Sequence, residues 1–145
     1  MLLAFLNIYE NKNVLITGDT GFKGSWLTWW LHSLGANISG FALPPRDQQD
    51  LFASADMKEV VHHIDGDIRD FTLVRDVIKK RNPRVIFHLA AQALVRESYR
   101  DPVETVSTNV LGTVNLLEAV RLAEKPCAVI VVTSDKCYEN REWCF

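Results

Sequence analysis

Residues 14–27 decide the fold, and they read Val14-Leu15-Ile16-Thr17-Gly18-Asp19-Thr20-Gly21-Phe22-Lys23-Gly24-Ser25-Trp26-Leu27. An apolar run typical of a buried strand is followed by three glycines at intervals of three residues and then by an amphipathic helix. Gly18 allows a tight turn, Gly21 allows backbone N–H groups to approach a pyrophosphate, and Gly24 allows the helix to pack closely on the strand. This pattern in this context predicts a dinucleotide-binding turn at a helix N-terminus, and a purely structural glycine turn is the alternative.

The rest of the chain alternates between apolar runs and helical patterns, which predicts a doubly wound parallel sheet of the Rossmann type, an α/β fold with about five strands. The strands are expected at residues 13–17, 38–42, 60–65, 85–90 and 128–132. Helices are expected at residues 22–34, from the N-cap Asp70 to Pro83, and from Pro102 at the first helical position to Pro126. Residues 46–59 are expected to form an excursion with a short helix, and residues 92–100 a loop.

Two helical faces follow from the apolar spacing. In the first helix the face expected to be buried is Leu27, Trp30, Leu31 and Leu34, with Gly35 as a left-handed helix end. Trp26 and Trp29 lie off this face and are expected to cover neighbouring core rather than a ligand. In the long helix the period is marked by Val106, Val110, Val114 and Leu117, and Asn109 interrupts it. A polar amide on such a face needs a partner, so we expect Asn109 to tie the helix to the loops that follow the strands.

Composition sets the broad class. The chain has 145 residues and a net charge of −2, which suits one domain and gives no reason to expect nucleic acid or an anionic membrane as a partner. Residues 1–12 form an apolar leader without a signal-peptide pattern, and residues 13–145 form the domain. The three cysteines match no metal spacing, so we expect no metal and a reducing cytoplasm. His62 and His63 are adjacent on a strand and point to opposite faces, which argues against a shared metal site.

The end of the second strand leaves the choice between NAD and NADP open. Many dinucleotide folds place an acid there to hold the ribose hydroxyls, whereas this chain has Leu43-Pro44-Pro45-Arg46. Arg46 is either a 2′-phosphate ligand or an exposed loop arginine. Asp67, after the third strand, is either an acceptor for the adenine amino group or a turn carboxylate.

A polar cluster follows the fifth strand, where Thr133, Ser134, Asp135 and Lys136 are consecutive. A carboxyl group beside an ammonium group can divide acid and base roles when burial shifts their pKa values. A charged turn after a strand is the alternative from spacing alone.

These segments resemble the extended short-chain dehydrogenase/reductase family, and within it the CDP-glucose 4,6-dehydratases. The resemblance rests on residues 17–27, Gly66-Asp67-Ile68-Arg69-Asp70, His88-Leu89-Ala90-Ala91-Gln92, residues 108–113 and Thr133-Ser134-Asp135-Lys136 with residues 137–140. It covers residues 13–143. The run from Phe22 to Leu27 and the Ser-Asp-Lys cluster indicate the subgroup, whereas the glycines and the third segment are common to many sugar-nucleotide enzymes.

The resemblance implies tight binding of NAD and conversion of CDP-glucose to a 4-keto-6-deoxy sugar for surface polysaccharide synthesis. A hydride leaves C4, water is lost across C5 and C6, and the hydride returns to C6. Family members are often homodimers. The cofactor site implied by the resemblance is Gly18, Thr20, Gly21, Phe22, Gly24, Asp67, Ile68, Leu89, Ala90, Ala91 and Thr133. The catalytic residues would be Ser134 on the 4-hydroxyl, Asp135 as acid and Lys136 in place of the C5 base, and Gln92 would join Ser134 in binding substrate.

Two departures from the family qualify these expectations. Asp19 stands where the subgroup usually has histidine, and its carboxylate would repel the pyrophosphate unless it points away. The family's Tyr-x-x-x-Lys pair is also missing, since Tyr138 is followed at that distance by Glu142. We therefore expect the N-terminal part of a dehydratase, inactive alone. The alternatives are a nucleotide-sugar epimerase or reductase and a non-catalytic dinucleotide-binding remnant.

Overall fold

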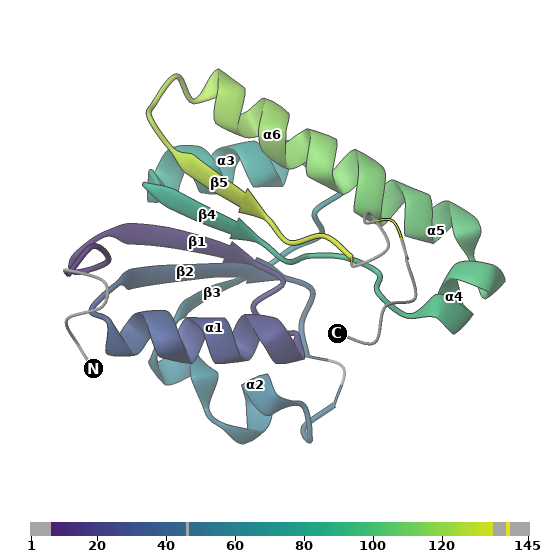
Figure 1. Ribbon diagram of the computed structural model, residues 1–145, viewed down its shortest axis with the longest axis horizontal. Coiled ribbons are helices and arrows are strands. Elements are labelled where there is room, and N and C mark those ends of the chain that lie inside the picture. The colour runs from purple at the N-terminus through teal and green to yellow at the C-terminus, as the bar shows by residue number, and fades with distance from the viewer. Residues whose placement is uncertain (1–6, 46, 135–138, 140–145) are drawn as a thin grey trace.

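The computed structural model describes residues 7–45, 47–134 and 139, and it contains one parallel sheet between two layers of helices (Figure 1). The strand order is β3-β2-β1-β4-β5 and each neighbouring pair is parallel. The strands are β1 (Asn13–Thr17), β2 (Asn37–Ala42), β3 (His62–Asp65), β4 (Val85–His88) and β5 (Ala128–Val131). The predicted fold class is confirmed, although the last three strands are shorter than expected.

The helices divide between the two faces of the sheet. They are α1 (Phe22–Ser33), α2 (Leu51–Ser54), the 3₁₀-helix η2 (Met57–Glu59), α3 (Phe71–Arg81), α4 (Val95–Arg100), α5 (Pro102–Val106), the π-helical turn η3 (Ser107–Leu111) and α6 (Gly112–Leu122). In Figure 1, α1 and α2 lie on one face, and α3 and α6 lie on the other. Each layer encloses its own apolar cluster, one around Val14, Ile16 and Leu31 and the other around Leu15, Ile86 and Leu116.

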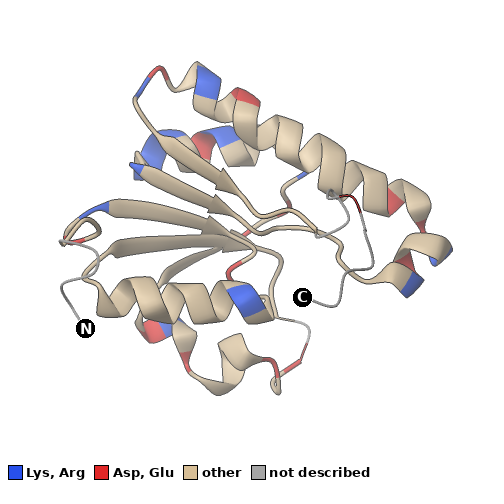
Figure 2. Cartoon of the chain, viewed as in Figure 1, with Lys and Arg blue, Asp and Glu red and all other residues tan. Residues whose placement is uncertain are grey.

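The central strand β1 carries the glycine turn at its carboxyl end. Its residues from Val14 to Thr17 are buried, because β2 and β4 flank the strand and helices cover both faces. The strand order reverses between β1 and β4, and ligands of open α/β sheets bind at the carboxyl side of such a switch point. The charged segments in Figure 2 lie mainly on helices and connections, whereas the sheet is almost free of them.

Local signals placed the helix ends correctly. Gly35 follows α1 with a φ of +80°, a left-handed conformation that a side chain would strain. Asp70 caps α3 by accepting a hydrogen bond from the Leu73 amide at 3.0 Å. Pro102 occupies the first turn of α5, and Asp101 caps that helix through the Glu104 amide at 2.8 Å.

The predicted buried face of α1 is wrong in part. Trp30 is 52% exposed, and the residues of α1 that are buried are Gly24, Ser25, Thr28 and Leu31. Small residues face the sheet because α1 starts directly from the glycine turn and must lie close to β1. Trp26 and Trp29 are also more than half exposed, so the expectation that they cover core is wrong.

The long helix is continuous in Figure 1 but contains the π-helical turn η3, which changes the phase of its faces. Val106, Val110 and Val114 are more than half exposed and Leu117 is 46% exposed, whereas Gly112, Leu116 and Ala119 are buried. The predicted apolar stripe therefore faces outward. The loop expected at residues 92–100 was also wrong in part, because its second half forms α4.

Candidate functional site

A cleft of about 650 Å³ opens where the carboxyl ends of the strands meet. Nine of the residues predicted for the cofactor and substrate line it, namely Gly18, Thr20, Gly21, Phe22, Asp67, Ile68, Ala90, Ala91 and Gln92. They come from three separate segments: the glycine turn, the residues that follow β3 and the loop that follows β4. The fold therefore brings together most of the predicted site at the edge of the sheet where ligands are expected.

The glycine turn is fixed by backbone contacts that leave no room for side chains. Gly18 has a φ of +77°, and a Cβ there would lie 2.7 Å from the Ala90 nitrogen and 2.8 Å from the Leu89 carbonyl carbon. The Gly18 amide donates to the Phe41 carbonyl at 2.9 Å. Gly21 precedes α1 as its N-cap residue, so the first amides of the helix face the cleft edge. This is the arrangement that binds phosphate at helix N-termini.

Asp19 points away from the cleft, although it belongs to the turn. Its side chain is fully buried, and Oδ2 lies 2.7 Å from Nδ1 of His63 on β3. His63 also contacts Asp65 through Nε2 at 3.1 Å, whereas His62 is exposed. Burial raises the pKa of Asp19. Burial alone would lower the pKa of His63, but the hydrogen bonds and charges of both carboxylates outweigh it and raise that pKa.

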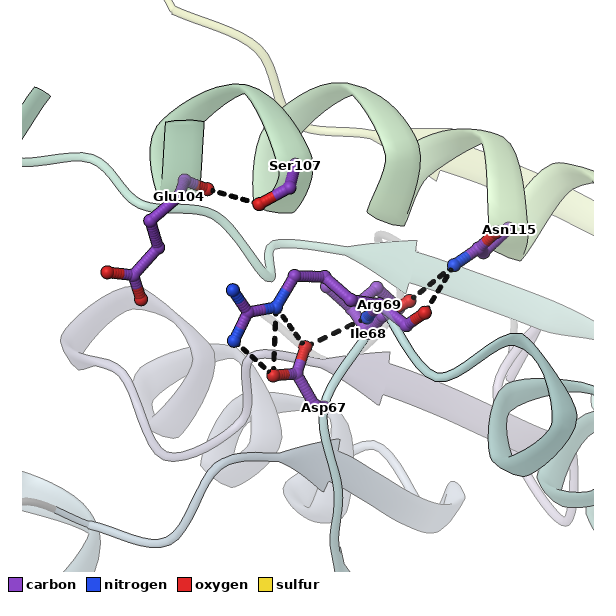
Figure 3. Close-up of polar contacts among 6 residues, drawn as sticks. All are labelled: Asp67, Ile68, Arg69, Glu104, Ser107 and Asn115. Atoms are coloured by element: carbon purple, nitrogen blue, oxygen red, sulfur yellow. Dashed lines mark hydrogen bonds and ion pairs between the residues drawn. The ribbon is translucent and has the colours of Figure 1, made fainter. Parts of the chain in front are cut away.

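Asp67 and Arg69 form a forked ion pair at the rim of the cleft (Figure 3). The Arg69 Nε lies 3.0 and 2.9 Å from the two carboxylate oxygens of Asp67, and these hydrogen bonds hold the pKa of that carboxyl below its usual range. Asn115 on α6 donates to the carbonyls of Ile68 and Arg69 at 3.2 and 2.9 Å. The ion pair and the Asn115 hydrogen bonds thus fix residues 67–69, and the ionised carboxylate of Asp67 lines the cleft.

A buried hydrogen-bond chain runs through His88 and connects the sheet to the long helix. The Ala90 amide donates to the Thr17 hydroxyl, which lies 2.7 Å from His88 Nδ1, and His88 Nε2 lies 3.0 Å from the Thr113 hydroxyl. Thr113 itself donates to the Asn109 carbonyl at 2.7 Å. Because the Thr113 proton is used, His88 Nε2 donates to Thr113, and in a neutral ring Nδ1 then accepts from the Thr17 hydroxyl. Burial lowers the pKa of His88, in agreement with a neutral ring.

The expected role of Asn109 is confirmed. Its Oδ1 accepts from the Gln92 amide at 2.8 Å, and its Nδ2 donates to the Gln92 carbonyl at 2.9 Å. The Gln92 side chain in turn donates to the Thr105 hydroxyl at 3.0 Å. The loop that borders the cleft is therefore anchored on the long helix by a side-chain amide.

Four predicted residues lie outside the cleft lining. Gly24 is buried beneath the turn, and Leu89 packs in the core with its backbone against Gly18. Thr133 and Ser134 are exposed and follow β5. Asp135 and Lys136, like Arg46, lie outside the described residues.

Sequence reasoning missed several residues that line the cleft. These are Phe41, Ala42, Leu43, Pro44, Pro45, Gln49, Asp50, Leu51, Gly66, Arg69, Leu94, Glu104 and Thr108. The first two residues end β2 and the next three follow it directly, so their position at the carboxyl end of a predicted strand was the available signal. Within the described residues no group of three histidine, cysteine or acidic side chains is arranged to hold a metal, and no helix is long and apolar enough to cross a bilayer.

Comparison with known proteins gives one family match and many relatives. Residues 15–142 match the model of the family described as GDP-mannose 4,6 dehydratase. A CDP-glucose 4,6-dehydratase of Salmonella typhimurium is 49% identical over 137 residues, which are 94% of this chain and 38% of the relative. A CDP-paratose 2-epimerase of Salmonella typhi is 37% identical, over 89% of this chain and 38% of the relative. The chain thus spans well under half the length of these curated relatives.

Solved structures of epimerases share the fold. A UDP-glucose 4-epimerase from Brucella ovis, solved in complex with NAD, superposes with a TM-score of 0.71 at 31% identity over 83% of this chain and 35% of that chain. An epimerase from Methanothermobacter thermautotrophicus superposes with a TM-score of 0.72 at 30% identity over 86% of this chain and 36% of that chain.

Proposed function

Because the chain belongs to the GDP-mannose 4,6 dehydratase family, we propose that its cleft binds NAD as the cofactor part of a nucleotide-sugar 4,6-dehydratase. One observation carries this proposal: the glycine turn, the Asp67 segment and the Ala90 segment line one cleft at the switch point of the sheet. The NAD-bound Brucella epimerase of similar fold supports the choice of cofactor.

The residues of the cleft fit an extended dinucleotide. Gly21 adds no side chain at the place where a pyrophosphate would meet the first amides of α1. Asp67 carries an ionised carboxylate that can accept a hydrogen bond from an adenine amino group, and Ile68 offers an apolar contact beside it. NAD, when bound, supplies the hydride acceptor. The described residues Leu43 to Pro45 carry no acid for the ribose hydroxyls, so NADP remains the competing cofactor to measure.

The proposed substrate is CDP-glucose, and the proposed product is CDP-4-keto-6-deoxyglucose. The support is the 49% identity to the Salmonella CDP-glucose 4,6-dehydratase. By the same resemblance Ser134 binds the 4-hydroxyl, Asp135 protonates the departing 6-hydroxyl, Lys136 takes the place of the base at C5 and Gln92 borders the sugar. We further propose that the 145-residue chain alone has negligible turnover, because no tyrosine in it is followed four positions later by lysine.

The first test is calorimetric titration of the purified chain with NAD and with NADP. Gly21→Val is the control variant, because its side chain would fill the approach to the helix N-terminus. Saturable binding of NAD by the native chain and loss of binding in Gly21→Val is the expected result. A native chain that is folded by circular dichroism and binds neither dinucleotide would overturn the proposal.

The second test concerns the reaction. A chimera in which this chain replaces the matching residues of the Salmonella dehydratase should convert CDP-glucose to a product with a keto group at C4 and a methyl group at C6, whereas this chain alone should not. An epimerase is the second candidate, favoured by the 37% identity to CDP-paratose 2-epimerase. A chimera product that keeps its C6 hydroxyl would favour that reading.

A further inference from the structure

The glycine turn has a buried anchor that its sequence motif does not require. The carboxylate of Asp19 is fully buried under the turn, and its Oδ2 lies 2.7 Å from Nδ1 of His63. Its other oxygen, Oδ1, is buried without a hydrogen-bond partner among the described residues. Gly40 on β2 makes room for this contact, because a Cβ at that position would overlap the Asp19 carboxylate. The charge of Asp19 is therefore matched chiefly by one histidine that lies 44 residues away in the sequence.

His63 is built to be a cation. Its two ring nitrogens face two carboxylates, Asp19 at 2.7 Å and Asp65 at 3.1 Å, and only an imidazolium donates from both nitrogens. Its side chain is 5% exposed and its ring lies 5.0 Å from that of Phe52 on α2, a helix that contains no charged residue. Its neighbour His62 is exposed and lies near the charges of Lys80 and Arg81.

We propose that Asp19 and His63 are positioning residues that hold the glycine turn in its phosphate-binding shape and cancel charge beneath the phosphate site. The inference rests on the proposed binding of NAD. The Asp19 carbonyl accepts from the Ser25 hydroxyl at 3.0 Å, so the anchored residue also fixes the first turn of α1. With His63 protonated, the buried pair is neutral. Without that proton an uncompensated carboxylate lies under the site that receives the pyrophosphate, and like charges repel strongly in a buried environment.

The test uses calorimetric titration of the 145-residue chain with NAD in five variants. His63→Leu removes the cation, His63→Asn keeps a donor near the Nδ1 position, and Asp19→Asn removes the carboxylate. The double variant Asp19→Asn/His63→Leu removes both charges, and His62→Asn is the matched control on the same strand.

We expect His63→Leu to weaken NAD binding about tenfold or more, whereas Asp19→Asn in the same background restores most of the affinity. His63→Asn is expected to lie between these two variants, and His62→Asn to bind like the native chain. The native affinity should fall as pH rises through the folded pKa of His63, which lies above its ordinary value of about 6.5, whereas Asp19→Asn should show a flatter profile. Equal affinities for His63→Leu and His62→Asn, or a double variant no better than His63→Leu, would overturn the proposal.

Hydrogen exchange separates this inference from the proposed function. The amides of Gly18, Gly21 and Ser25 are hydrogen-bonded at 2.9, 3.1 and 2.8 Å, so their exchange reports the shape of the turn without any ligand. If the native chain does not bind NAD, the cofactor proposal fails. The anchor is still supported if these amides exchange faster in His63→Leu than in His62→Asn while α3 is unchanged. Unchanged exchange of the three amides would refute the anchor.

Discussion

Replacing Gly24 by alanine tests whether the turn and α1 are packed as tightly as their backbone contacts indicate. A Cβ at Gly24 would lie 2.8 Å from the Gly18 carbonyl carbon and 2.8 Å from the Asp19 Cα, and it would overlap the Gly18 carbonyl oxygen. These neighbours are all backbone atoms, so relief requires a shift of α1 away from β1. Overpacking of this kind costs about 1–3 kcal/mol. The better helix propensity of alanine returns about 1 kcal/mol.

Because the overlap involves three backbone atoms, we place the strain at or above the upper end of that range, and expect a net loss of about 2–3 kcal/mol in the free energy of unfolding. The melting temperature should fall by about 5–10 °C. Urea and thermal unfolding followed by far-UV circular dichroism measure both quantities. Gly21→Ala is the matched control, because its Cβ would lie 3.3 Å from a single atom, the Gly18 oxygen, and it should cost less than about 1 kcal/mol. Equal stabilities for the two variants would refute the reasoning.

Three further predictions concern the polar contacts around the cleft. Asn109→Ala breaks both hydrogen bonds to the Gln92 backbone and should lower the free energy of unfolding by about 1–3 kcal/mol in urea titrations, and an unchanged midpoint would contradict this. Burial lowers the pKa of His88 in the folded chain, so the neutral ring stabilises the fold fully above the unfolded pKa of about 6.5, and this stability is lost as pH falls through the folded pKa. The free energy of unfolding of His88→Gln should therefore decrease less than that of the native chain between about pH 7 and about pH 5. Arg69→Gln removes the main cause of the low pKa of Asp67, so the carboxyl should titrate at higher pH by NMR, and an identical titration would rule out the ion pair as the cause.

The features of the fold that depend on residues close together in the sequence could be predicted. Asp70 lies three residues before the amide that it caps, and Gly35 follows the last residues of the helix that it ends. The glycine spacing placed the cleft correctly, because the motif contains both its strand and its helix. In each case the interacting residues are only a few positions apart in the sequence, so their spacing determines how they lie relative to one another.

The errors come from features that depend on packing between distant segments. The stripe through Val106, Val110 and Val114 was expected to face the core, but all three are more than half exposed, and the π-helical turn η3 interrupts the α-helical repeat between the first and the last of them. Hydrophobic periodicity assumes a constant number of residues per turn and therefore cannot detect this change. It also cannot distinguish an inward apolar face from an outward one, and the small residues Gly112 and Ala119 proved to face the sheet.

The direction of Asp19 is the clearest case in which strand register decides the chemistry of the cleft. The motif alone places this residue beside a phosphate, where a carboxylate would oppose binding. Parallel pairing aligns Ile16 with Gly40 and Gly40 with His63. Because Gly40 has no side chain, the Asp19 carboxylate can lie over β2 and reach His63 on β3. Each of these residues is unremarkable in its own segment. Together they convert an unfavourable charge into a buried ion pair, so the departure from the family pattern at position 19 has to be judged together with positions 40 and 63.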